Sequence, residues 1–242
     1  MGIRERQDRE RQAVRQAILE AARDLFITEG YRNVSIRKIA ERIEYSPAAI
    51  YSYFPSKDDI FFALAEEGFR RLDLKIRDLV AGDDPLEDVR RCWWAYYEFS
   101  KEHREFFELM FVDRSVPQIT DQWPGMAVVH DMLAVAAERI QRCVDAGIFA
   151  PGTDAVVALH LVWGAFTGPA VIGNACRLAP GEDPDALARD VLELIIAGLK
   201  AGSPTTFIPC SPQTSDIPCL PHTSESVRPV VTGVRGVDIH DT

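Results

Sequence analysis

The stretch from Ser35 to Lys57, SIRKIAERIEYSPAAIYSYFPSK, decides the fold of this 242-residue chain. Ser35 is a typical helix N-cap, and the isoleucines that follow it recur at the spacing of one helical face. Ser46 and Pro47 supply a second N-cap with proline at the first helical position, and Pro55 ends that helix. The turn between the two short helices has about three residues, which is the spacing of a helix-turn-helix.

The second of these helices is predicted to direct Ile50 and Phe54 into a core, together with Tyr45 from the turn. The residues left to face outward are Pro47, Ala48, Ala49, Tyr51 and Tyr53. Small residues at a helix N-terminus allow the backbone to approach base edges, and tyrosine hydroxyls and the Lys57 ammonium suit phosphate oxygens. The alternative is a helical hairpin whose aromatic side chains only pack.

The rest of the chain up to about residue 202 also follows a helical period, so the fold class is all-α. We expect about nine helices, over 12–29, 35–43, 46–53, 57–80, 85–101, a short one through 111, 125–147, 154–176 and 184–201, with a loop over 112–124. Residues 1–57 form a head of three helices, and residues 58–202 form a helical body. Residues 203–242 are rich in Pro, Ser and Thr without an amphipathic period, which predicts a disordered tail.

Charge is divided unevenly between these regions. The net charge of the chain is −10, yet residues 1–57 carry +3 and the remainder carries −13. A basic head on an acidic body is typical of a DNA-reading segment joined to a regulatory domain. The five cysteines are few and widely spaced, which favours a reducing cytoplasm. Because no Cys or Cys/His cluster has zinc spacing, we expect no metal and no cofactor.

Two longer runs carry a family resemblance. They are ILEAARDLFITEGYRNVSIRKIAERI (18–43) and IYSYFPSKDDIFFAL (50–64). Through them the region from Gln12 to Leu64 resembles the DNA-binding domain of the TetR family of transcriptional regulators. The resemblance implies a ligand-responsive, DNA-binding repressor rather than an enzyme. It also implies a homodimer formed through the last two helices, about 154–176 and 184–201, and release from an operator when a small apolar molecule binds the body.

The resemblance also implies which residues contact DNA. Ser35 would touch phosphate, Pro47 to Ala49 would face bases, Tyr51 and Tyr53 would contact DNA, and Lys57 would bind phosphate. The full expected set is Ser35, Arg37, Ser46, Pro47, Ala48, Ala49, Tyr51, Tyr53 and Lys57. Two positions depart from the family pattern. Glu44 replaces the usual turn glycine, which questions the backbone geometry there, and Ala48 replaces a frequent glycine.

Aromatic residues are concentrated in the body. The expected ligand-binding set is Trp93, Tyr97, Phe107, Phe111, Trp123, His130, Trp163 and Phe166, with His160 as a further candidate. An apolar pocket with a few polar groups would bind a small molecule. The alternative is that most of these side chains fill the core. One C-terminal subgroup of the family has a Trp followed by a His-Gly pair, and here Thr167 replaces that histidine.

The run AVVALHLVWGAFTGPAVIGNAC (155–176) contains no charged residue and is long enough to span a bilayer. His160, Asn174, Pro169 and three glycines argue against a membrane span, as does the lack of flanking Lys/Arg bias. We therefore expect no membrane association. The run is predicted to form a helix buried on most sides, with small residues that allow another helix to approach closely.

Two other function classes stay open at this point. An all-α enzyme is suggested only by the acidic run 83–88, which lies at a predicted helix N-terminus, where acids complement the helix dipole. A helical protein-interaction module is the other alternative. A salt titration of DNA binding separates both from a regulator, since phosphate contacts make duplex affinity fall steeply with salt.

Overall fold

The computed structural model describes residues 2–120, 122–202 and 205–207. Within these residues the chain is all-α and forms nine α-helices without a strand, as predicted. The α-helices are α1 (Ile3–Glu29), α2 (Ile36–Arg42), α3 (Pro47–Tyr51), α4 (Lys57–Arg77), α5 (Pro85–Glu102), α6 (Arg104–Phe107), α7 (Met126–Asp145), α8 (Ala155–Asn174) and α9 (Pro184–Ala201). A 3₁₀ turn, η1 (Tyr31–Asn33), and a π-helical segment, η2 (Glu108–Val112), complete them. Apart from 205–207, the predicted tail over 203–242 lies outside the described residues.

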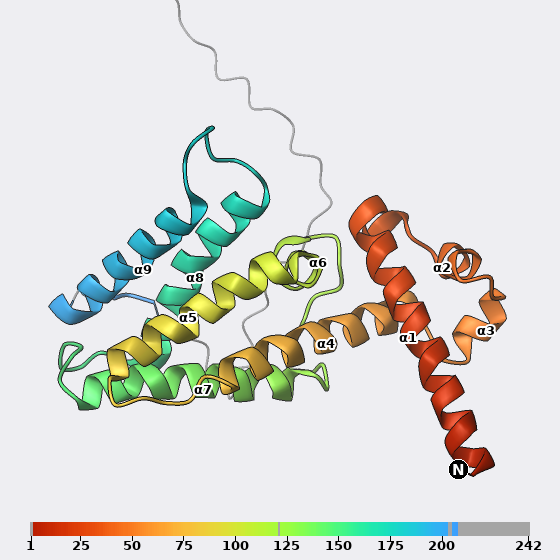
Figure 1. Ribbon diagram of the computed structural model, residues 1–242, viewed down its shortest axis with the longest axis horizontal. Coiled ribbons are helices and arrows are strands. Elements are labelled where there is room, and N and C mark those ends of the chain that lie inside the picture. The colour runs from red at the N-terminus through yellow and green to blue at the C-terminus, as the bar shows by residue number, and fades with distance from the viewer. Residues whose placement is uncertain (1, 121, 203–204, 208–242) are drawn as a thin grey trace, which may run out of the picture. The chain divides into compact units, whose positions relative to one another are not determined.

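Helices α1 to α3 and the N-terminal part of α4 form the head, in which α1 packs on α2 and α4, and α2 packs on α3 (Figure 1). Its core residues are Ile18 and Phe26 of α1, Ile39 of α2, Ile50 of α3 and Phe61 of α4, all buried. Helix α1 begins at Ile3, nine residues before the predicted start at Gln12. The added turns have few apolar residues and include an (i, i+4) ion pair, Arg6 to Glu10, so apolar periodicity could not reveal them.

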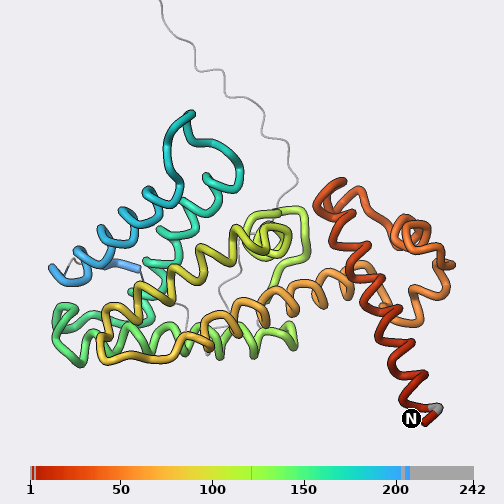
Figure 2. The backbone as a smooth tube through the Cα atoms, viewed as in Figure 1, coloured from red at the N-terminus to blue at the C-terminus, as the bar shows by residue number. Residues whose placement is uncertain are grey.

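Polar side chains begin most of the helices where the sequence predicts. Ser35, Ser46 and Ser56 each accept a hydrogen bond from a backbone N–H in the first turn of α2, α3 and α4. Helix α4 then continues without a break for 21 residues and joins the head to the body (Figure 2). One helix therefore contributes to both cores.

The body contains α5 to α9 with the C-terminal part of α4. Helix α7 packs against α4, α5 and α8, and α8 packs against α5 and α9. The segment from α5 to η2 departs from the single short helix predicted through Phe111. Four residues of α6 continue into the π-helical turn of η2, whose Met110 lies against Gly68 of α4. A Cβ at Gly68 would stand 2.4 Å from the Met110 sulfur, so glycine allows this close approach.

A buried arginine of α7 binds the C-terminal end of α4. Arg139 of α7 is buried and donates to the carbonyls of Ile76 and Leu79, at 3.1 and 2.9 Å. Since the last carbonyls of a helix have few partners within it, the guanidinium supplies further donors at this end of α4. This end of α4 is thereby held against α7.

Helix α8 departs from the prediction that it is buried on most sides. It is long and apolar enough to cross a membrane by length and composition, yet only 33% of its most apolar window is buried within the chain. One face packs on α5, α7 and α9, while Val156, Trp163 and Ile172 stay exposed. The sequence prediction failed because an unbroken apolar run does not reveal which of its faces a single chain can cover.

Candidate functional site

The helix-turn-helix presents a small, solvent-exposed helix. Ser46 caps α3 by accepting from the Ala49 N–H at 3.2 Å, and Ile50 anchors the helix in the head core. Pro47 and Ala48 are exposed in the first turn, and Tyr51 is 55% exposed one turn later. Such a surface can approach base edges, because only small groups cover its backbone.

The turn before α3 contains an unusual backbone conformation. Glu44 has φ of +60°, the left-handed conformation that glycine adopts without strain. Glu44 therefore holds a backbone conformation that favours glycine, at a cost of about 1–2 kcal/mol. Tyr45 beside it is 45% exposed, which corrects the prediction that it faces the core.

The other residues expected at DNA belong to α2 and its N-cap, to α3, and to the turn after α3. Ser35 caps α2 by accepting from the Lys38 N–H at 3.3 Å, and its hydroxyl proton is still available for donation. Arg37 is exposed and pairs with Glu41 at 2.9 Å, which leaves most of its guanidinium in solvent. Ala49 and Tyr53 are only half-exposed, and the Arg11 guanidinium lies 5.7 Å from the Tyr53 ring centroid.

Lys57 has a structural role that the sequence does not reveal. Its ammonium donates to the carbonyls of Tyr31 and Val34, at 2.8 and 3.0 Å, and lies 4.0 Å from the Tyr31 ring centroid. Burial lowers the Lys57 pKa, against the opposing effect of the Asp58 carboxylate. Two of its three protons are thus used within the head, and one is left for a phosphate. Substituting Lys57 would disturb the head as well as any DNA contact.

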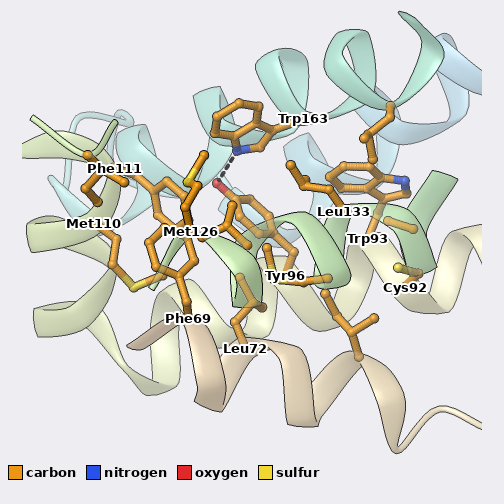
Figure 3. Close-up of a pocket in the computed structure, with 16 residues that line it drawn as sticks. Phe69, Leu72, Cys92, Trp93, Tyr96, Met110, Phe111, Met126, Leu133 and Trp163 are labelled. Carbon is orange, nitrogen blue, oxygen red and sulfur yellow. Dashed lines mark hydrogen bonds between the residues drawn. The ribbon is translucent and has the colours of Figure 1, made fainter. Parts of the chain in front are cut away.

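The body encloses an apolar cavity of about 310 Å³, which is within the usual range for small-molecule sites. The wall consists of aromatic, aliphatic and sulfur-containing side chains from α4, α5, η2, the loop before α7, α7 and α8 (Figure 3). They are Phe69, Leu72, Ile76, Cys92, Trp93, Tyr96, Met110, Phe111, Ile119, Met126, Val129, Met132, Leu133, Ala136, Leu159 and Trp163. No charged side chain occurs among these described residues. Burial raises the pKa of Tyr96 to about 12 and that of Cys92 to about 11, so both stay neutral.

Two family models match the chain and together cover more than half of it. The model for bacterial regulatory proteins of the tetR family matches residues 18–64, and the model for the tetracyclin repressor-like C-terminal domain matches residues 89–195. The chain belongs to the TetR family. It is therefore a DNA-binding transcriptional regulator with a helix-turn-helix.

Individual TetR-family relatives match over nearly their whole length. The transcriptional repressor AcnR of Corynebacterium diphtheriae is 30% identical over 191 residues, 79% of this chain and 94% of the relative. The transcriptional repressor Rv1474c of Mycobacterium tuberculosis is 30% identical over 186 residues, 76% of this chain and 91% of the relative. The solved structure of PfmR from Thermus thermophilus has a TM-score of 0.61 at 24% identity, over 75% of this chain and 98% of that one, which shows the shared fold.

The TetR-type body brings together only part of the predicted ligand set. Trp93, Phe111 and Trp163 line the cavity. The other five predicted residues, Tyr97, Phe107, Trp123, His130 and Phe166, do not line it. Tyr97, Phe107 and Phe166 are buried in the core, Trp123 stacks on Phe62 beside the head, and His130 is on the exposed side of α7.

Helix geometry explains why Tyr97 lies outside the cavity whereas Tyr96 lines it. Tyr96 and Tyr97 are consecutive on α5 and so point in directions about 100° apart. Tyr96 faces the cavity, whereas the Tyr97 hydroxyl donates to Asp185 of α9 at 2.9 Å. Sequence reasoning also missed the sulfur-containing residues of the wall, Cys92, Met110, Met126 and Met132. Their methionine sulfurs give a wall that adapts to the shape of a ligand.

Proposed function

We propose that this protein is a homodimeric repressor that binds an operator through residues 1–57. A small apolar molecule that occupies the cavity of residues 58–202 would release it. The observation that carries the proposal is the double role of α4, which contributes Phe61 to the head core and Leu72 to the cavity wall. A molecule that changes the packing around Leu72 therefore acts on the same rigid helix that carries the head.

In this proposal α3 enters the major groove. Pro47, Ala48 and Ala49 approach the bases, and Tyr51 contacts DNA from the next turn. Ser35, Arg37, Ser46, Tyr53 and Lys57 supply phosphate contacts at the flanks of the groove. The exposure of Arg37 and Tyr51 and the free hydroxyl protons of the capping serines support these roles.

The proposed dimer interface is the uncovered side of α8 and α9. Val156 and Ile172 of α8 are exposed, and Leu194 of α9 is 72% exposed. Large apolar side chains that stay exposed on two neighbouring helices favour a contact with another molecule. Two copies joined through these helices would present two α3 helices to half-sites about 34 Å or more apart.

Release requires that the ligand bind the DNA-incompetent state more tightly than the DNA-bound state, because equal affinity for both shifts no population. Repression, rather than activation, is proposed from the names of the relatives AcnR and Rv1474c. The proposal further includes a cytoplasmic location, no cofactor and no catalytic activity.

The proposed DNA contacts are tested by fluorescence anisotropy with a duplex selected from a random library on the wild-type protein. Arg37→Ala is compared with Arg70→Ala, since both arginines are exposed and paired with a glutamate four residues away. Each lost phosphate contact lowers the slope of log Kobs against log salt by about 0.9, so Arg37→Ala should lower it by about 1.8 in a dimer. Arg70→Ala should keep the wild-type slope.

Equal slopes for the two variants would contradict the placement of Arg37 at phosphate. Duplex binding that does not weaken with salt would contradict the regulator itself and favour an interaction module.

A further inference from the structure

The cavity wall carries a single hydroxyl group, which lies among apolar side chains. Tyr96 carries the only side-chain oxygen among the described lining residues, and the residue itself is 4% exposed. Its hydroxyl lies next to the Trp163 indole nitrogen (Figure 3), and the ring centroids of Tyr96 and Phe111 are 5.7 Å apart. The Trp93 indole nitrogen points away from Tyr96 in the same view. A ligand group that donates a hydrogen bond would therefore find its side-chain oxygen acceptor at Tyr96.

The donor and the acceptor in each hydrogen bond around the Tyr96 hydroxyl can be assigned from the neighbouring groups. Thr167 Oγ1 lies 2.7 Å from the Trp163 carbonyl, which can only accept, so the one hydroxyl proton of Thr167 is donated there. The 2.9 Å contact between Tyr96 and Thr167 is then a donation from the Tyr96 hydroxyl. Trp163 Nε1 donates to the Tyr96 oxygen at 3.3 Å. The proton of Tyr96 is thus used, and a lone pair on its oxygen is left to accept.

The shape and charge of the wall restrict the rest of the ligand. Five lining side chains are aromatic, namely Phe69, Trp93, Tyr96, Phe111 and Trp163. Aromatic rings attract other rings edge to face, and methionine sulfurs also favour them. A carboxylate would be buried without a cationic partner, which carries a large free-energy penalty.

We propose, on the basis of the proposed function, that the ligand is a neutral aromatic molecule with a hydroxyl group that donates to the Tyr96 oxygen. Ketones and ethers of the same size, which only accept, find no free donor at this position. Thr167 sets this preference, because it takes the Tyr96 proton that an accepting ligand would need.

Isothermal titration calorimetry with four matched probes tests the proposal: 2-naphthol, 2-methoxynaphthalene, naphthalene and 2-naphthoate. One hydrogen bond changes affinity by about three- to tenfold. Wild-type protein should bind 2-naphthol more tightly than its methyl ether by this factor, and 2-naphthoate should bind at least about 100-fold more weakly than 2-naphthol. In Tyr96→Phe the preference for naphthol over the ether should fall below about twofold, whereas Tyr97→Phe, outside the cavity, should keep it.

Thr167→Val supplies an independent test if Tyr96→Phe folds poorly. Without the Thr167 oxygen the Tyr96 proton is free for the ligand, so the methyl ether should gain affinity and the preference should fall below about twofold. Equal wild-type affinity for naphthol and ether would overturn the hydroxyl assignment, as would tight binding of naphthoate or no binding of any probe. None of these results affects the salt-dependent DNA binding that tests the proposed function.

Discussion

Replacing Asp88 by asparagine should destabilise the body by breaking the polar cluster between α5 and α7. Asp88 is fully buried and accepts from the Gly82 N–H, at 3.0 Å to each carboxylate oxygen. It also accepts from the Arg142 guanidinium at 2.6 Å and from Arg91. Burial would raise the Asp88 pKa, but these donors outweigh it, and the pKa lies below its ordinary value.

The size of the effect follows from the exposure of the partners. Removing one member of a fully buried ion pair costs about 3–5 kcal/mol, because the other charge is left uncompensated. The side chains of Arg91 and Arg142 are 39% and 34% exposed to solvent, so water can partly replace the lost carboxylate. We therefore expect Asp88→Asn to lower the free energy of unfolding by about 2–3 kcal/mol.

Urea unfolding at fixed protomer concentration measures this loss, with Asp83→Asn as a control that removes an exposed charge nearby. Because the pKa of Asp88 is depressed by folding, its contribution is complete above about pH 5 and lost as the pH falls below about 4. The difference between wild type and Asp88→Asn should shrink over that range. A loss under about 0.5 kcal/mol at pH 7, or a difference unchanged at pH 3, would refute the assigned role.

Three further perturbations have defined outcomes. Glu44→Gly should raise the free energy of unfolding by about 0.5–1 kcal/mol, since glycine adopts φ of +60° without strain, and an unchanged urea midpoint would contradict this. Iodoacetamide at pH 8 should label the exposed Cys176 at least about 100-fold faster than Cys92, because the Cys92 thiol is buried and neutral. Peptide mass mapping measures the two labelling rates, and equal rates would mean that the cavity wall opens. Leu194→Asp should yield monomers in sedimentation experiments and lose operator binding. Leu74→Asp, which changes another exposed leucine, on α4, should stay dimeric, and two dimeric variants would contradict the proposed interface.

Sequence alone was sufficient for features that depend on neighbours along the chain. Capping by Ser35 and Ser46 depends on atoms within three residues, so both helix starts were predictable. The start of α1 was not, because charged residues form its first turns and leave no apolar period. Family membership was also predictable, because the helix-turn-helix pattern is contiguous in the chain.

Only the tertiary structure decided where the body leaves space. Tyr96 and Tyr97 have the same chemistry, and their roles differ because α5 presents one to the cavity and the other to Asp185 of α9. Likewise, Lys57 bonds to the carbonyls of Tyr31 and Val34, which the chain brings back from more than twenty residues away. The cavity is formed between several packed helices, so the periodicity of any one helix does not predict which of its side chains line it.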